Sequence, residues 1–255
     1  MLGLRTGLGL ACALGVAWAA VPAAAARAAG EQRTVRALND RGPLGDERLS
    51  DERGVSRYAG AVARAPVRVL PSTGAPQVGR LRYLTEDGPF EVYPALESRV
   101  DSAGRAWVRI RLPMRPNGRT GWVPRNDLGP LHAVRTMLRV NRGTLRATLY
   151  RDRRRIWSSP VGVGAASTPT PAGRFWIRSR LTGLRGDRVY GPYAFGTGAY
   201  SVLSDWPGGG VIGIHGTDQP QLIPGRPSHG CIRVPNAAIR RLWLRMPIGT
   251  PVVIV

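Results

Sequence analysis

Residues 61–130 contain short runs in which hydrophobic and polar positions alternate, and this pattern predicts a small β module. The segment "APVRVLP" alternates Val67 and Val69 with other residues, and "RAWVRIRLP" repeats the alternation from Trp107 to Ile110. Turn-like intervals separate these runs from "GRLRYLTEDG", "PFEVYPALE" and "GRTGWVPRNDLG". Short strands at such intervals are typical of a small barrel or sandwich.

Strand-like runs continue from Met137 to the end of the chain, so we expect a second β region. A hairpin turn is predicted at Asn141-Arg142-Gly143, because asparagine and glycine favour tight turns. Further strands are expected at residues 147–150 and 156–164 and in the segments "GRFWIRSRL", "GVIGIH" and "TPVVIV".

One segment near the C-terminus has helical periodicity instead. In "NAAIRRLWLRMP", Ile239, Leu242 and Met246 recur at the spacing of one face of an amphipathic helix. Asn236 is the expected N-cap and Pro247 the expected stop. The pattern therefore predicts a mainly β chain with one short helix near its end.

The first residues have the pattern of a secretory signal peptide, which we assign to residues 1–28. Arg5 precedes an apolar run from Gly7 to about Ala20, and small residues follow, with an A-x-A frame ending at Ala28. We expect cleavage near Ala28 and export to the cell envelope, either the cell wall or the periplasm. An uncleaved anchor is the alternative. Residues 29–60 are polar with few large apolar residues, so they are predicted to be a linker, mostly disordered or weakly helical.

Charge narrows the classes of partner. The 255 residues carry 37 basic side chains, all of them arginine, against 16 acidic ones, a net charge of +21. Such a balance favours acidic polymers or anionic surfaces, so association with a cell wall or a membrane surface is expected. No basic-aromatic motif or zinc-finger spacing points to nucleic acid, which we do not expect as a partner.

Cysteine chemistry centres on the segment "PSHGCIRV". Removal of the signal peptide, with Cys12, leaves Cys231 as a single cysteine, which excludes an intramolecular disulfide. Attack by a cysteine on an acyl carbon needs a thiolate, a base and backbone N–H groups for the oxyanion. His215 and His229 are both candidate bases, and His215, at the end of a separate apolar strand, is geometrically freer. The N–H groups around Gly230 would form the donor nest.

A metal site and an inert cysteine are both disfavoured at this cluster. The side chains of His215, Asp218, His229 and Cys231 match no common zinc spacing, so no metal is expected. An inert cysteine beside two chance histidines is disfavoured, since the chain has 3 histidines in all. Arg233 is either a surface arginine or a bidentate holder of a substrate carboxylate.

The motifs "IGIHGTDQP" and "SHGCIRV" resemble the signature of the L,D-transpeptidase catalytic domain of the YkuD type. The segment "TPTPAGRFWI" resembles the family's T-P-x-G-x-F strand entry, and "MPIGTPVVIV" resembles its closing G-T-P-V strand. The resemblance covers about residues 134–255, in the family's order. It implies a β-sandwich catalytic domain, which we place at residues 131–255.

The resemblance also implies roles for individual residues. Cys231 would be the nucleophile and His215 its general base and acid, with the imidazole oriented by the carbonyl of Gly216. His229 and Gly230, together with Cys231, would line the oxyanion site. The remaining two positions, Ser228 and Arg233, would support the loop or contact the substrate.

The reaction implied by the resemblance is transfer of a peptidoglycan stem peptide. A tetrapeptide stem would lose D-Ala, leave a thioester on the cysteine, and then pass to the side-chain amine of a second stem as a 3→3 cross-link. No metal or organic cofactor is expected, and carbapenem-type inhibitors are expected to acylate the cysteine. The alternatives are hydrolysis of the same thioester by an L,D-carboxypeptidase, attachment of a protein to the wall, and a catalytically inactive wall-binding protein.

The first β region has a resemblance of its own. The segment "WVRIRLPMRPNGRTGWVPRNDL" resembles bacterial SH3-like domains of exported wall proteins, in which a tryptophan-bearing strand and a closing G-x-T-G-W-V strand recur. Trp107 and Trp122 are then expected in the core or a groove wall. The predicted fold is a small SH3-like barrel over residues 61–130 followed by the β-sandwich catalytic domain.

Overall fold

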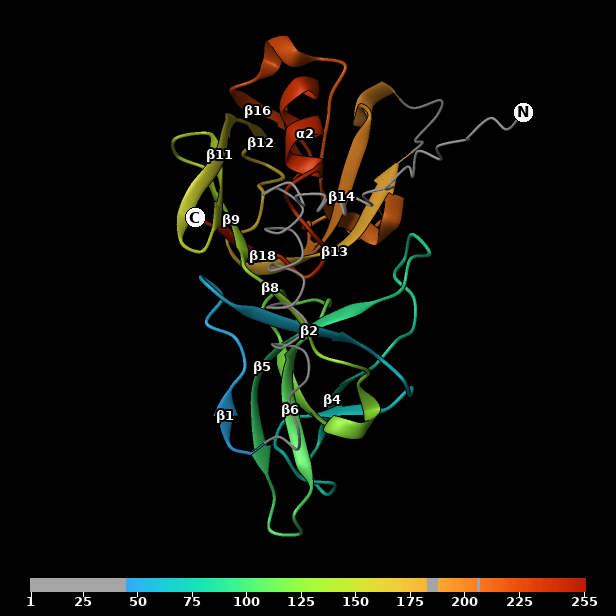
Figure 1. The fold of residues 1–255 in the computed structure, drawn as a ribbon. Coiled ribbons are helices and arrows are strands. Elements are labelled where there is room, and N and C mark those ends of the chain that lie inside the picture. The colour runs from blue at the N-terminus through green and yellow to red at the C-terminus, as the bar shows by residue number, and fades with distance from the viewer. Residues whose placement is uncertain (1–44, 183–187, 206) are drawn as a thin grey trace, which may run out of the picture. The chain divides into compact units, whose positions relative to one another are not determined.

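The computed structural model describes residues 45–182, 188–205 and 207–255, all of which belong to one structural unit that spans residues 35–255 (Figure 1). The predicted signal peptide and the first part of the predicted linker lie outside the described residues. No helix in the described ranges is long and apolar enough to cross a membrane. The predicted boundaries at residues 60 and 130 stay predictions.

The N-terminal half of the described chain forms an 8-stranded sheet. Its strand order is β4-β3-β7-β6-β5-β2-β8, with β1 paired to β5, and the paired strands run antiparallel. The strands are β1 (Glu47–Arg48), β2 (Ser56–Gly60), β3 (Pro66–Arg68), β4 (Gln77–Arg80), β5 (Val92–Val100), β6 (Ala106–Arg111), β7 (Thr120–Pro124) and β8 (His132–Val134).

The alternating runs of the first region supply the core of this sheet. Val67, Val108 and Ile110 are fully buried, because alternate positions of a strand face the same side. The sequence predicts Trp107 and Trp122 in the core or a groove wall, and both are buried, at 0% and 7% exposed. The likeness of this sheet to SH3-like domains stays a prediction.

The predicted linker contains ordered strands, and this part of the prediction is wrong. Residues 47–48 form β1 and residues 56–60 form β2, a central strand between β5 and β8. Hydrogen bonds help to hold this segment in place. The buried Ser50 hydroxyl accepts from the backbone N–H of Arg57 at 2.7 Å, and the Arg57 guanidinium donates to the carbonyl of Leu49. Polar residues in such a strand carry no hydrophobic alternation that the sequence would reveal.

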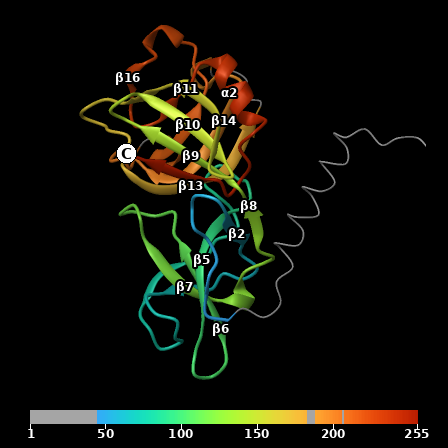
Figure 2. The same cartoon turned by 60° about the vertical axis from the view of Figure 1, so that its left-hand side comes forward.

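The C-terminal half forms a 10-stranded sheet with the order β11-β10-β9-β18-β13-β14-β15-β17-β12-β16. In Figure 2, the labelled strands β11, β10, β9 and β13 follow one another in this order. The strands are β9 (Thr136–Asn141), β10 (Arg146–Arg151), β11 (Arg154–Pro160), β12 (Gly162–Gly164), β13 (Gly173–Thr182), β14 (Tyr193–Tyr200), β15 (Val211–His215), β16 (Gly225–Ser228), β17 (Ile232–Arg233) and β18 (Pro251–Ile254). The predicted hairpin turn at residues 141–143 is present, with the Asn141 side chain accepting the N–H of Gly143 at 2.9 Å.

The helix α2 (Asn236–Trp243) packs beside β14 and places Ile239 and Leu242 in the core (Figure 1). Asn236 is not the N-cap that the sequence predicts. Pro235 holds that position, and the Asn236 side chain accepts the backbone N–H of Thr217 at 2.9 Å. The Asn236 side chain therefore bonds to a residue far along the chain instead of capping its own helix. The remaining helical turns of the described chain are the 3₁₀ segments η1 (Arg125–Asp127), η2 (Arg188–Tyr190), η3 (Pro207–Gly210) and η4 (Pro220–Leu222).

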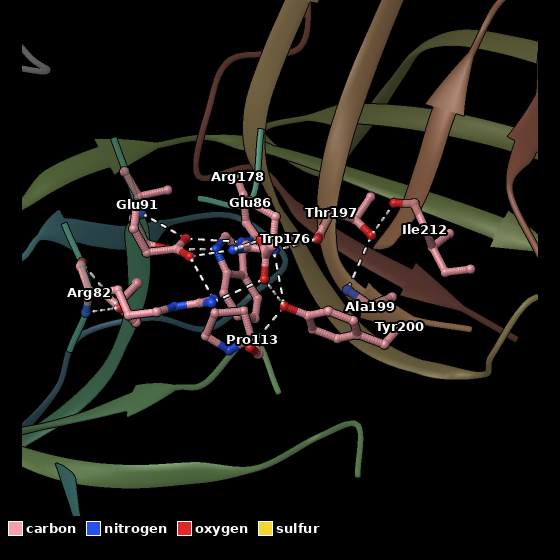
Figure 3. Close-up of polar contacts among 12 residues, drawn as sticks. Arg82, Glu86, Glu91, Pro113, Trp176, Arg178, Thr197, Ala199, Tyr200 and Ile212 are labelled. Atoms are coloured by element: carbon pink, nitrogen blue, oxygen red, sulfur yellow. Dashed lines mark hydrogen bonds and ion pairs between the residues drawn. The ribbon is translucent and has the colours of Figure 1, made fainter. Parts of the chain in front are cut away.

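Buried polar contacts link the two sheets (Figure 3). Arg178 on β13 binds Glu91, which precedes β5, and Trp176 donates its indole N–H to the carbonyl of Val92 at 2.8 Å. Arg178 and Glu91 are each 1% exposed. Specific hydrogen-bonded groups therefore link the two sheets.

Candidate active site

Two parallel neighbours of the second sheet bring the candidate residues together. Strand β15 pairs with β17 so that Ile214 faces Ile232 and His215 faces Arg233. Cys231, directly before β17, therefore lies beside Gly213 of β15, whose N–H points to Cys231 Sγ at 3.3 Å. This one parallel pairing brings Cys231 and His215, which lie apart in the sequence, to neighbouring strands.

Gly213 presents bare backbone to the side chains of both His215 and Cys231. A Cβ at this position would stand 3.6 Å from His215 Cδ2 and 3.7 Å from Cys231 Sγ. The imidazole and the sulfur thus border the same open face of Gly213. A larger residue at this position would place its side chain against both the imidazole and the sulfur.

The His215 imidazole is held in one tautomer. Its Nδ1 lies 2.6 Å from the carbonyl oxygen of Gly216, and the side chain is 2% exposed. A carbonyl oxygen only accepts, so Nδ1 carries the hydrogen and neutral His215 keeps its lone pair on Nε2. The Tyr190 ring meets the imidazole edge-on, with ring centroids 4.9 Å apart. The arrangement provides an imidazole that a backbone carbonyl orients.

Partial burial favours the protonated form of the Cys231 thiol. Removal from water raises the pKa of Cys231 above its ordinary value, against the hydrogen bond from Gly213 and the positive charge of Arg233, which both lower it. Desolvation is the larger effect here. A thiol in this state needs a base to become a nucleophile, and His215 is the oriented imidazole at the site.

Ser228 organises the turn before the cysteine. Its hydroxyl donates to the carbonyl of Cys231 at 2.6 Å and accepts the N–H of Gly230 at 3.2 Å, while the residue is 4% exposed. Thr170 and Ser201 donate to the carbonyls of Gly230 and His229 at 2.7 and 3.0 Å. Ser228 is therefore placed to support the loop, because its hydroxyl is engaged within it.

These bonds change the expected oxyanion site. The Gly230 N–H is already used by Ser228, so it is not a free donor as the sequence suggests. In the described part of the chain, the Cys231 N–H has no hydrogen-bond acceptor. Gly230 itself has φ 122°, and a Cβ there would stand 2.7 Å from Ile212 Cδ1, so glycine is required.

The two remaining candidates lie at the edge of the site. The His229 side chain belongs to the turn and is exposed, in contrast to the buried ring of His215. Arg233 donates to Gln219 Oε1 at 2.9 Å, and its buried Nε has no acceptor among the described residues. The charge of Arg233 acts on Cys231.

A cavity of about 220 Å³ opens onto Cys231 and His215. Two of its lining residues, Tyr190 and Asp87, were not predicted from the sequence. Tyr190 lies in "GDRVYGPY", which carries no motif, and Asp87 comes from the loop between β4 and β5 of the other sheet. Among the residues that the structure describes, no group of three or more histidine, cysteine or acidic side chains is placed to hold a metal ion.

Comparison with known proteins matches residues 135–254 to the family model described as the L,D-transpeptidase catalytic domain, YkuD. A Bacillus subtilis protein named "Putative L,D-transpeptidase YkuD" is 36% identical over 118 residues, which are 45% of this chain and 63% of that protein. The chain thus spans less than two thirds of this relative.

Solved structures of L,D-transpeptidases are also similar. A cysteine-to-serine mutant of an Enterococcus faecium L,D-transpeptidase is 26% identical, covers 47% of this chain and 49% of its own, and superposes with a TM-score of 0.38. The catalytic domain of the E. faecium enzyme, acylated by ertapenem, is also 26% identical over 47% of this chain and 96% of its own, with a TM-score of 0.35.

Proposed function

We propose, from the premise that residues 135–254 form an L,D-transpeptidase catalytic domain of the YkuD type, that the protein transfers peptidoglycan stem peptides through a thioester on Cys231. The observation that carries the proposal is the oriented base. The contact between His215 Nδ1 and the Gly216 carbonyl leaves Nε2 as acceptor, and the open face of Gly213 separates that imidazole from the sulfur. The match of residues 135–254 to the L,D-transpeptidase family model supports this class of substrate.

The acylation step uses groups that lie in the site. Nε2 of His215 takes the thiol proton, and Sγ attacks the carbonyl carbon of the third stem residue. The N–H of Cys231 donates to the oxyanion of the tetrahedral intermediate. The bond to D-Ala then breaks, and the imidazolium returns the proton to the leaving amine. A thioester on Cys231 and free D-Ala are the products.

The second step resolves the thioester. The side-chain amine of another stem attacks the thioester carbon, a proton passes to His215, and the thiol is restored as sulfur leaves. The product is a 3→3 cross-link. Water in place of the amine gives a tripeptide, the carboxypeptidase alternative. We propose the protein acts after export, in the cell envelope, where its net charge of +21 favours the anionic wall or a membrane surface.

Incubation of the purified protein with a disaccharide tetrapeptide tests the proposal. Mass analysis of the products separates the outcomes: a cross-linked dimer supports transpeptidation, and a tripeptide supports hydrolysis. Unchanged substrate with the wild type would refute both and favour a wall-binding role. Cys231→Ala is the control and is expected to leave the tetrapeptide intact.

Two further comparisons test the assigned roles. We expect a carbapenem such as ertapenem to add its mass to the wild type and not to Cys231→Ala in an intact-mass spectrum. Equal adducts on the wild type and Cys231→Ala would contradict the assignment of Cys231 as nucleophile. His215→Ala is expected to slow adduct formation far more than His229→Ala, since the first ring is buried and oriented while the second is exposed. Comparable losses would move the role of base away from His215.

A further inference from the structure

Asp87 carries a carboxylate into the cavity of the candidate active site from outside the catalytic domain. The residue lies in a tight turn between β4 and β5, closed by hydrogen bonds from Thr85 N–H to the carbonyl of Pro89 and from Gly88 N–H to the carbonyl of Thr85. Its side chain lines the same cavity as Cys231 and His215. The first sheet therefore contributes a charged group to a site whose other residues come from the second.

Two glycines of the catalytic domain make room for this carboxylate. A Cβ at Gly196 on β14 would stand 3.7 Å from Asp87 Oδ2, and one at Gly208 would stand 3.8 Å from Oδ1. Both glycines also line the cavity. The carboxylate oxygens therefore lie against bare backbone at the cavity wall.

Among the described residues, the cations near Asp87 are paired with other carboxylates. Nearby, the guanidiniums of Arg82 and Arg178 form ion pairs with Glu86 and Glu91 (Figure 3). The two guanidiniums are thus paired with two carboxylates. Asp87 itself has no hydrogen bond or ion pair among the described residues. Burial and the charge of Glu86 raise the pKa of Asp87, while Arg178 lowers it.

The apolar lining of the cavity strengthens the electrostatic interactions of the Asp87 carboxylate. Leu181, Ala194, Phe195 and Val211 line it with apolar groups. A carboxylate beside apolar walls favours a cation more strongly than one in open water, because the local dielectric constant is lower. A protonated amine is the group that such a carboxylate binds with charge-assisted hydrogen bonds.

We propose that Asp87 binds a side-chain ammonium group of the stem-peptide substrate and so makes the active site select amine-bearing stems. This inference rests on the proposed function. The ammonium belongs either to the third residue of the acyl donor or to the acceptor stem before it loses its proton. The shared chemistry is a primary amine on a stem-peptide side chain.

The donor arm of the test compares two disaccharide tetrapeptides that differ only in acetylation of the third residue's side-chain amine. The initial rate of D-Ala release is measured for the wild type, Asp87→Asn and Asp205→Asn. Asp205 is a matched control, because it is an exposed carboxylate in the loop that also contains Gly208 but does not line the cavity. Thermal unfolding of each variant verifies that it is folded.

If Asp87 binds the donor amine, the wild type and Asp205→Asn prefer the free amine by about ten- to a hundredfold, the range expected for a hydrogen bond to a charged group. Asp87→Asn then loses that preference. If Asp87 binds the acceptor amine, D-Ala release is unaffected and Asp87→Asn shifts the products from cross-linked dimer towards tripeptide at a given acceptor concentration.

Two results overturn the inference, and they are distinguishable. Equal donor preference and equal product partition in the wild type and Asp87→Asn would remove Asp87 from substrate binding while the proposed function stands. Absence of D-Ala release by the wild type from either donor would overturn the proposed function, and the inference with it.

Discussion

Replacement of Glu91 by glutamine removes one charge from the buried cluster that joins the two sheets. The carboxylate oxygens of Glu91 accept Nε of Arg178 at 2.9 Å and also its Nη2, and both residues are 1% exposed (Figure 3). In Glu91→Gln one oxygen becomes an NH₂ group, so a donor faces a donor. The guanidinium then stays buried with one of its two main acceptors lost.

The size of the effect follows from this geometry. Loss of one partner of a buried ion pair costs about 3–5 kcal/mol. The lower end, about 3 kcal/mol, is expected because Glu86 still accepts Nη2 of Arg178 at 2.8 Å and the glutamine oxygen keeps one bond. For a chain of this size, about 3 kcal/mol corresponds to a decrease in Tm of roughly 6–12 °C.

Thermal unfolding followed by circular dichroism measures the difference, with Glu97→Gln as the matched control. Glu97 pairs with Arg109 at 3.1 Å, but those side chains are 31% and 41% exposed. An exposed pair contributes about 0.5 kcal/mol, so the control should lower Tm by roughly 1–2 °C. Equal decreases in the two variants would refute the reasoning that burial of the Arg178 cluster makes it important for stability.

Three other measurements test the site and the cluster. Gly213→Ala should fold normally, since its Cβ would meet atoms at no less than 3.6 Å. Its acylation by a carbapenem, followed by intact mass, should be about tenfold slower than that of the wild type. An unchanged rate would show that the bare backbone at Gly213 is not needed for acylation. Alkylation of free Cys231 by iodoacetamide should accelerate up to and beyond pH 9.0, because burial raises the pKa of this thiol; a plateau near neutral pH would contradict that. Burial alone would raise the pKa of Glu86, but the charge of Arg178 and the Tyr200 hydroxyl lower it to about 2 from 4.5. Its stabilising effect is therefore full above pH 4.5 and lost as pH falls through about 2. Urea titrations should show the stability gap between the wild type and Glu86→Gln closing in that range; a gap independent of pH would be inconsistent with it.

Local patterns in the sequence determined much of the C-terminal half. The strands predicted after Met137 and the helix at residues 236–243 carry regular hydrophobic periodicity, and the structure confirms them. The proposed nucleophile and base could be named because Cys231 and His215 lie in compact motifs, although their roles stay proposals. In these segments the side chains that face the core repeat at a fixed interval, so the chain itself records which element forms.

The tertiary structure decided what depends on partners far along the chain. The Asn236 side chain accepts the N–H of Thr217 instead of capping its helix, and the Ser228 hydroxyl accepts the N–H of Gly230. Residues 56–60 form a central strand by pairing with β5. Asp87 reaches the cavity only because another sheet carries its turn there. Hydrogen bonds and charge pairs between distant segments depend on three-dimensional proximity, and no periodicity or spacing along the sequence encodes it.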